Sequence, residues 1–233
     1  MNCSDHPIDM RYGQLASNKR INRTIYRCFQ YLMPEDEHRF LRAFREQAHG
    51  SYQAMHTFRE LILGAYLISS GFSARYEYLV GDQTPDWCIM DDEGVIISVV
   101  ELMNFHVDKA TEYEIDRQWK DRSIAAVWRD ANKNNVDRLY HCIWRKAQVY
   151  RHLVEKLAAP YVIGVFADLR AALDLEEVRT CLLNDGSGIF EMYPAVSGLL
   201  YFEESCGRYQ FRYIHNSLAL RSMDLPDGRF PST

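Results

Sequence analysis

The feature of this sequence that most constrains its fold is a pair of strand-like segments with apolar residues on both faces. The segments cover 85–90 and 95–105, and Asp91-Asp92-Glu93-Gly94 joins them. This tetrapeptide has the composition of a hairpin turn. Strands that are apolar on both faces are typical of the buried centre of a sheet. The chain must therefore supply further elements that cover this hairpin.

The rest of the chain supplies helices and further strands. Hydrophobic periodicity predicts helices over 20–33, 35–49, 52–70, 109–130, 135–157 and 174–183. Further strands are expected at 74–80 and 161–166, with a late hairpin of 198–202 and 209–214. This order predicts an α/β protein with a mixed central β-sheet flanked by helices.

No internal domain boundary is marked in the sequence. It contains no repeat, low-complexity tract or linker, and its 233 residues, 47% hydrophobic and 25% charged, are ordinary for a globular protein. We expect one domain over 1–233. A polar tail of about 15 residues and helices would occupy 1–50, a core 52–166, and a helix and hairpin 167–233.

Hydropathy and cysteine spacing bear on the cellular location of the protein and on whether disulfides or zinc stabilise it. No apolar stretch approaches the ~20 residues that span a bilayer, and the N-terminus lacks a basic start followed by an apolar run. A cytoplasmic protein without membrane contact is expected, and a homo-oligomer is compatible with the sequence. The six cysteines are scattered singly, which predicts neither a disulfide scaffold nor a zinc site.

The charge is unevenly distributed along the chain. The net charge of −5 argues against bulk coating of nucleic acid, but 117–156 holds ten Lys or Arg against four acids. A basic helical region is compatible with a surface that faces phosphates, and equally with a solvated helix face. The candidate nucleic-acid contacts in this region are Arg138, Arg145, Lys146 and Tyr150.

Asp86 and Glu101 are acidic residues on the two central strands. If Met90 pairs with Val95 across the turn, Asp86 lies opposite Val99 and is a diagonal neighbour of Glu101 on the same face. Diagonal neighbours are about 7–8 Å apart, a gap that two carboxylates converging on a cation can close. Oxygen ligands suit Mg²⁺. Alternatively, Asp86 caps a turn and Glu101 pairs with a basic side chain.

These residues resemble the PD-(D/E)XK nuclease superfamily. Its core is a helix, a hairpin carrying Pro-Asp on one strand and Asp/Glu-x-Lys on the next, then a helix and another strand. Thr84-Pro85-Asp86 and Val99-Val100-Glu101-Leu102-Met103 match this outline. Phe58-Arg59-Glu60-Leu61 is similar to the helix segment with an acidic residue in many members. Lys146-Ala147-Gln148-Val149-Tyr150 resembles the Gln-x-x-x-Tyr element of some members, and the likeness covers about 52–166.

The resemblance implies a restriction-endonuclease-like core and a metal-dependent phosphodiesterase, a nuclease, that acts on DNA. It implies that Asp86, Glu101 and the Leu102 carbonyl bind Mg²⁺ or Mn²⁺. Glu60 would orient a metal-bound water, as the corresponding acid does in the family. The sequence departs from the family at Met103, where a lysine is expected, and a thioether neither orients nor deprotonates water.

The missing lysine leaves alternatives open. Lys146, on the following helix, takes over its role as in some members of the family, or it is an exposed lysine of a basic helix. His106 and Lys109 are weaker substitutes. The chain is otherwise a catalytically inactive nuclease-like module that binds nucleic acid or a protein partner, or its acids are incidental to a purely structural role.

Overall fold

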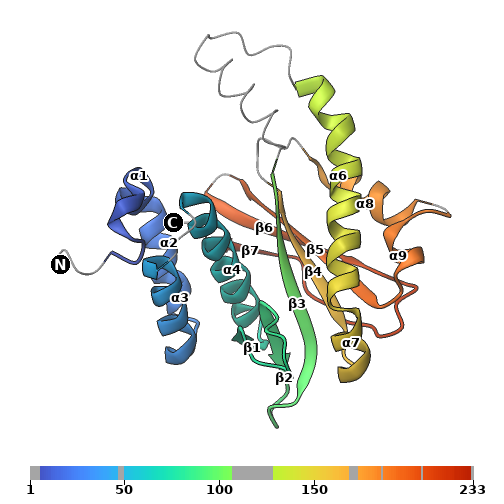
Figure 1. Ribbon diagram of the computed structural model, residues 1–233, viewed down its shortest axis with the longest axis horizontal. Helices are drawn as coiled ribbons and strands as arrows, with labels where there is room; N and C mark the ends of the chain where they lie inside the picture. Colours follow the sequence, from blue (N-terminus) through green and yellow to red (C-terminus); the bar gives the residue numbers. More distant parts are fainter. Residues whose placement is uncertain are drawn as a thin grey trace. The chain divides into compact units, whose positions relative to one another are not determined.

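The computed structural model describes residues 6–46, 50–106, 128–167, 173–184, 186–205 and 207–231 (Figure 1). The chain divides into two compact units. The first comprises Met1–Leu102, Glu204–Phe211 and Pro226–Thr233, and the second comprises Met103–Glu203 and Arg212–Leu225. The expectation of a single domain over 1–233 stays a prediction.

The described residues form a mixed α/β fold, as the sequence predicted. Their strands belong to one sheet in the order of the chain, with antiparallel pairs β1–β2, β2–β3 and β6–β7 and the parallel pair β4–β5. The helices are η1 Met10–Tyr12, α1 Gln14–Ser17, α2 Lys19–Phe29, α3 Pro34–Glu46, α4 Ser51–Ser69, α6 Trp128–Val149, α7 Arg151–Leu157, α8 Leu175–Leu183 and α9 Ile189–Met192. The strands are β1 Ser73–Tyr76, β2 Trp87–Met90, β3 Ile96–Phe105, β4 Tyr161–Ala167, β5 Val196–Ser205, β6 Arg208–His215 and β7 Gly228–Pro231.

The first unit is built around helix α4, which contacts α2, α3 and β1 (Figure 1). Its side chains are buried without interruption over 57–67, as expected of a helix enclosed on several sides. Gly64 permits the close approach of Trp87, because a Cβ atom at that position would lie 1.7 Å from the indole ring. Helix α4 therefore lies directly against the first residue of β2.

The second unit is built around strand β4, in which every residue is buried. β4 pairs in parallel with β5, and Tyr161 N donates to Ser197 Oγ at 2.9 Å where the pair begins. Helix α6 contacts β4, α8 and α9, and its Leu139, Ile143 and Ala147 are buried at helical spacing. The apolar face expected of 135–157 is therefore a core face of this unit.

Several expected boundaries differ from the structure. Most of the helix expected over 109–130 lies outside the described residues. The helix expected over 135–157 is two helices, since Tyr150 separates α6 from α7. The strand expected over 74–80 ends at Tyr76, because Glu77 has a left-handed φ of 44° that no strand continues through. The N-terminal tail contains η1 and α1, and β7 was not expected.

Over the described parts of the chain, none of the helices combines the length and the apolar character that crossing a bilayer requires.

Candidate functional site

The β2–β3 hairpin, within the first unit, determines how Asp86 and Glu101 face each other. Trp87 pairs with Val100 and Cys88 with Val99, and a register shift follows between Ile89 and Met90. Continuing this register by one residue puts Asp86 directly opposite Glu101. The expected pairing of Met90 with Val95 was wrong, since Met90 pairs with Ile96.

The two carboxylates are anchored by the backbone of each other's strand. Glu101 Oε1 accepts a hydrogen bond from the Asp86 backbone nitrogen at 2.9 Å. Asp86 Oδ2 accepts from the Leu102 backbone nitrogen at 2.6 Å. Each carboxylate therefore reaches a backbone group at or beside the other acid, and these bonds orient both side chains.

Burial makes the ionised forms of Asp86 and Glu101 costly in free energy. Glu101 is fully buried and Asp86 half-buried. An ionised carboxylate in such a place needs compensation by hydrogen bonds, a counter-charge or a cation. Carboxylate oxygens are ligands that hard divalent cations such as Mg²⁺ prefer. The donor chemistry of the pair therefore fits a divalent cation.

Mg²⁺ is compatible with a donor set of this size, because it is commonly bound through one or two carboxylates and retains several waters. Asp86 and Glu101 provide two carboxylates, and the Leu102 carbonyl is the third predicted ligand. Within the part of the chain that the structure describes, no group of three or more His, Cys, Asp or Glu side chains forms a metal cage. The residues fit a cation held by two carboxylates and not a closed protein cage.

Glu60 lies on α4 and is held by three neighbours. Its Oε2 accepts from the Tyr76 hydroxyl at 2.8 Å, and His56 Nε2 lies 3.1 Å from its Oε1. The Trp87 indole N–H donates to its backbone carbonyl at 3.0 Å. Glu60 is therefore a buried carboxylate in a fixed orientation, tied to the residue that follows Asp86.

The neighbourhood of Tyr76 is strongly negative. Burial raises the pKa of the Tyr76 hydroxyl, and the charges of Glu60, Glu77 and Asp86 raise it further. Burial and then the Glu60 charge raise the pKa of Glu77 as well. On the hairpin, burial and then Glu101 raise the pKa of the Cys88 thiol to about 12. Arg39 offsets part of this negative charge, since its guanidinium donates to the Tyr76 and Glu77 carbonyls and its charge lowers the pKa of Glu77.

The remaining predicted site residues belong to the second unit. Lys146 is half-buried in the last turn of α6, with its Nζ 5.9 Å from the centroid of the Tyr150 ring. The Arg138 guanidinium lies 5.3 Å from the Phe105 ring centroid and donates to the His106 carbonyl at 2.9 Å. Lys146 and Tyr150 are thus neighbours, while Arg138 has partners of its own.

Three further residues were singled out in the sequence. Arg145 is exposed on α6, Met103 is a buried core residue of β3, and Lys109 lies outside the described residues. The catalytic role of Lys146 and the nucleic-acid role of the basic residues stay predictions.

We call Glu60, Asp86 and Glu101, with the neighbours that hold them, the acidic site. Sequence reasoning missed two of these neighbours. His56 precedes Glu60 by four residues on one helix, a spacing that places two side chains side by side and was available as a signal. Tyr76 is sixteen residues from Glu60, and no local pattern indicates their hydrogen bond.

Comparison with known proteins adds no family to this description. A scan against protein-family models, a search of curated proteins and a search of solved structures each found no match. The resemblance to the PD-(D/E)XK nucleases therefore rests on the residues of this chain alone and stays a prediction.

Proposed function

We propose that this chain is a Mg²⁺-dependent phosphodiesterase that hydrolyses DNA. The observation that carries the proposal is the adjacency of the Asp86 and Glu101 carboxylates, each held by a backbone N–H of the opposite strand. Two adjacent, oriented carboxylates are the donor set with which proteins commonly hold Mg²⁺ at phosphoryl groups. Mn²⁺ is expected to substitute, because it also prefers oxygen ligands.

The role proposed for each group follows from its chemistry. When bound, the cation supplies Lewis acidity and lowers the pKa of water. Asp86, Glu101 and the Leu102 carbonyl hold it. Glu60 orients the water that attacks phosphorus, and one P–O bond of the DNA backbone breaks as the new one forms. Stabilisation of the charge that develops on the phosphoryl oxygens is the role that the family resemblance implies for Lys146.

The order of the elements also supports the proposal. Helix α4 with Glu60 precedes the β2–β3 hairpin with Asp86 and Glu101, and α6 and β4 follow. This order is the one that the predicted restriction-endonuclease-like core requires. The core and a cytoplasmic location are parts of the proposal, and a homo-oligomer is compatible with it.

A second candidate function is favoured by Met103. This residue is a buried apolar side chain where a nuclease of the proposed kind is expected to have lysine. A chain that lost the lysine and kept the fold would bind DNA or a protein partner without cutting it. The two candidates differ in a single observable, which is Mg²⁺-dependent cleavage.

The experiment compares cleavage of labelled single- and double-stranded DNA in Mg²⁺, Mn²⁺ and EDTA. The variants are Asp86→Asn and Glu101→Gln, in which the amide oxygen still accepts the backbone hydrogen bond while the charge is lost. The matched control is Asp92→Asn, an exposed acid of the turn in the same hairpin. Each site variant is expected to lose at least about 100-fold in cleavage rate, and the control to keep its rate.

Two outcomes contradict the proposal. Cleavage that persists at the wild-type rate in Asp86→Asn would come from a contaminant or from another site. Salt-sensitive DNA binding that needs no metal and yields no cleavage would support the non-catalytic module.

A further inference from the structure

Helix α2, in the first unit, is amphipathic, and all of its charged residues are basic. Its eleven residues include four basic residues, Lys19, Arg20, Arg23 and Arg27, and no acidic residue. Its apolar face, formed by Thr24, Ile25, Cys28 and Phe29, is buried, and α2 packs against α4. The basic residues therefore project from a helix whose other face is fixed in the core.

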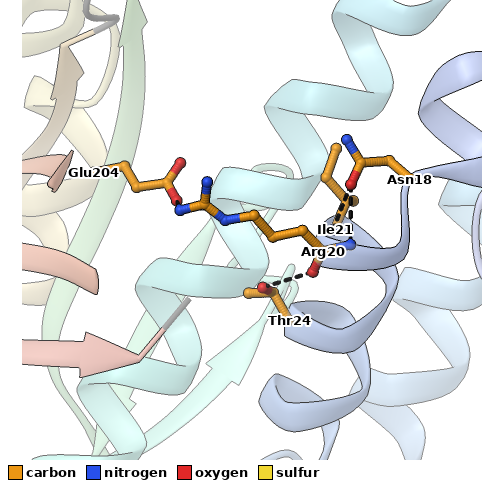
Figure 2. Close-up of polar contacts among 5 residues, drawn as sticks. All are labelled: Asn18, Arg20, Ile21, Thr24 and Glu204. Atoms are coloured by element: carbon orange, nitrogen blue, oxygen red, sulfur yellow. Dashed lines mark hydrogen bonds and ion pairs between the residues drawn. The ribbon is translucent and has the colours of Figure 1, made fainter. Parts of the chain in front are cut away.

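Three of these cations form a row along the helix. Lys19, Arg23 and Arg27 are spaced four residues apart, which puts them on one side of the helix over about 12 Å. Across the described residues, no carboxylate forms an ion pair with any of the three. Arg20 differs from them, since its guanidinium pairs with Glu204 at the end of β5 (Figure 2).

The charges in the first turn of α2 do not help the helix to fold. Lys19 and Arg20 occupy the first turn, where the helix dipole disfavours cations, and like charges four residues apart repel each other. Figure 2 shows that Asn18 caps this turn instead, because its side chain accepts from the backbone nitrogens of Arg20 and Ile21. Arg27, in the last turn, is favoured by the helix dipole, but repulsion between neighbouring cations of the row opposes helix stability, which indicates a ligand that neutralises the row.

The chemistry of the row favours nucleic acid over other polyanions. Tyr26 is 45% exposed and lies on the same face, three residues from Arg23. Aromatic rings between cations are typical of surfaces that contact phosphates and bases together. An anionic membrane is disfavoured, because an interfacial helix inserts its apolar face into lipid and that face of α2 is buried in the protein.

We propose that Lys19, Arg23, Tyr26 and Arg27 form a DNA-binding face on α2 that contacts the phosphate backbone. The choice of DNA as the ligand rests on the proposed function. The face itself rests on the charge, spacing and exposure of α2. It is separate in sequence from the basic segment 117–156 and was not indicated by the sequence analysis.

The test is a fluorescence-anisotropy titration of labelled single- and double-stranded DNA in EDTA over a series of NaCl concentrations. The test variant is Lys19→Gln/Arg23→Gln/Arg27→Gln. The matched control is Arg11→Gln/Arg151→Gln/Arg179→Gln, which removes the same charge from three arginines that each pair with a carboxylate elsewhere. Circular dichroism verifies that both variants remain folded.

The test variant is expected to bind at least about 10-fold more weakly than the wild type at 100 mM NaCl. Its log–log salt slope is expected to be smaller in magnitude by about 2 to 3 units, because three phosphate contacts are lost. The control is expected to bind within about twofold of the wild type, since its arginines are already engaged. Tyr26→Ala is expected to weaken binding of single strands, because stacking is lost.

The inference is overturned if the test variant binds DNA as the wild type does, or if test and control variants weaken equally. Binding of phosphatidylserine vesicles that depends on α2, with no DNA binding, also overturns it. Failure of the proposed function gives a different result. The wild type would then not cleave DNA in Mg²⁺, while DNA binding in EDTA would still depend on α2.

Discussion

Glu60 illustrates how single hydrogen bonds hold the acidic site together. Its carboxylate is 6% exposed and is bonded by the Tyr76 hydroxyl, while the Tyr76 ring stacks on Phe40 at a centroid distance of 3.8 Å. A buried carboxylate that loses a donor retains its desolvation cost. The hydroxyl of Tyr76 therefore stabilises the folded protein independently of its ring.

Tyr76→Phe isolates this hydroxyl. The variant keeps the stacked ring and removes only the donor, so the free energy of unfolding is expected to fall by about 1–3 kcal/mol. Urea denaturation followed by circular dichroism measures the change. Tyr78→Phe, at an exposed tyrosine two residues away, is the control and should change stability by less than about 0.5 kcal/mol. Equal stability of Tyr76→Phe and the wild type would mean that Glu60 does not depend on this bond.

Part of the acidic site could be read from single residues. The period-2 rule for strands put Asp86 and Glu101 on one face of the hairpin only together with the assumed pairing of Met90 with Val95. The register could not be read in the same way. The shift between Ile89 and Met90 has no signature in a run of apolar residues, and it converts the expected diagonal pair into directly opposed residues.

Helix α4 and strand β2 are joined by a contact that requires glycine. Gly64 lies in a helix interior, where replacement by alanine ordinarily stabilises a protein by about 0.5–1 kcal/mol. Here the added methyl group would lie 1.7 Å from the Trp87 ring. The clash must displace either the indole or the helix that carries Glu60.

Gly64→Ala is therefore expected to destabilise the protein by about 2–3 kcal/mol, the opposite sign to its helix propensity. Thermal unfolding followed by circular dichroism measures the effect. Gln53→Ala, a half-exposed position of the same helix, serves as the control, with an expected change within about 0.5 kcal/mol. A stabilised Gly64→Ala variant would show that α4 and Trp87 are not in close contact.

Long elements were predictable and short ones were not. Helices α3, α4 and α8 and strand β4 follow strong periodic or apolar runs, and their positions agree with the structure within a few residues. The end of β1 depends on the left-handed conformation of Glu77, a residue that rarely adopts it. Strand β7 has four residues and ends in proline, and it forms because β6 offers an edge for it to pair with.

Across the molecule, packing buries most of the described cysteines as free thiols. Cys28, Cys88 and Cys181 are buried free thiols. Burial raises the pKa of Cys28, and it raises the pKa of Cys88 and of Cys181 to about 12, well above the ordinary value near 8.5. A raised thiol pKa keeps the unreactive protonated form, so thiolate at Cys88 stays on the order of 0.1% at pH 9.

Thiol labelling tests this prediction over the whole fold. Among the described cysteines, the half-buried Cys142 is expected to react first with a disulfide reagent. Cys28, Cys88 and Cys181 should stay unmodified from pH 7 to pH 9 and react only in urea. Mass spectrometry assigns the sites, and Cys142→Ser serves as the control. Modification of Cys88 in the native protein as fast as in urea would contradict the burial of the hairpin.

Metal binding by Asp86 and Glu101 is tested most directly by Mn²⁺ electron paramagnetic resonance, which requires neither DNA nor turnover. The wild type and Asp92→Asn are expected to bind one Mn²⁺ that excess Mg²⁺ displaces, and Asp86→Asn/Glu101→Gln is expected to bind none at this site. Mn²⁺ binding of equal affinity and stoichiometry in the double variant would contradict the metal site, and with it the proposed hydrolysis of DNA.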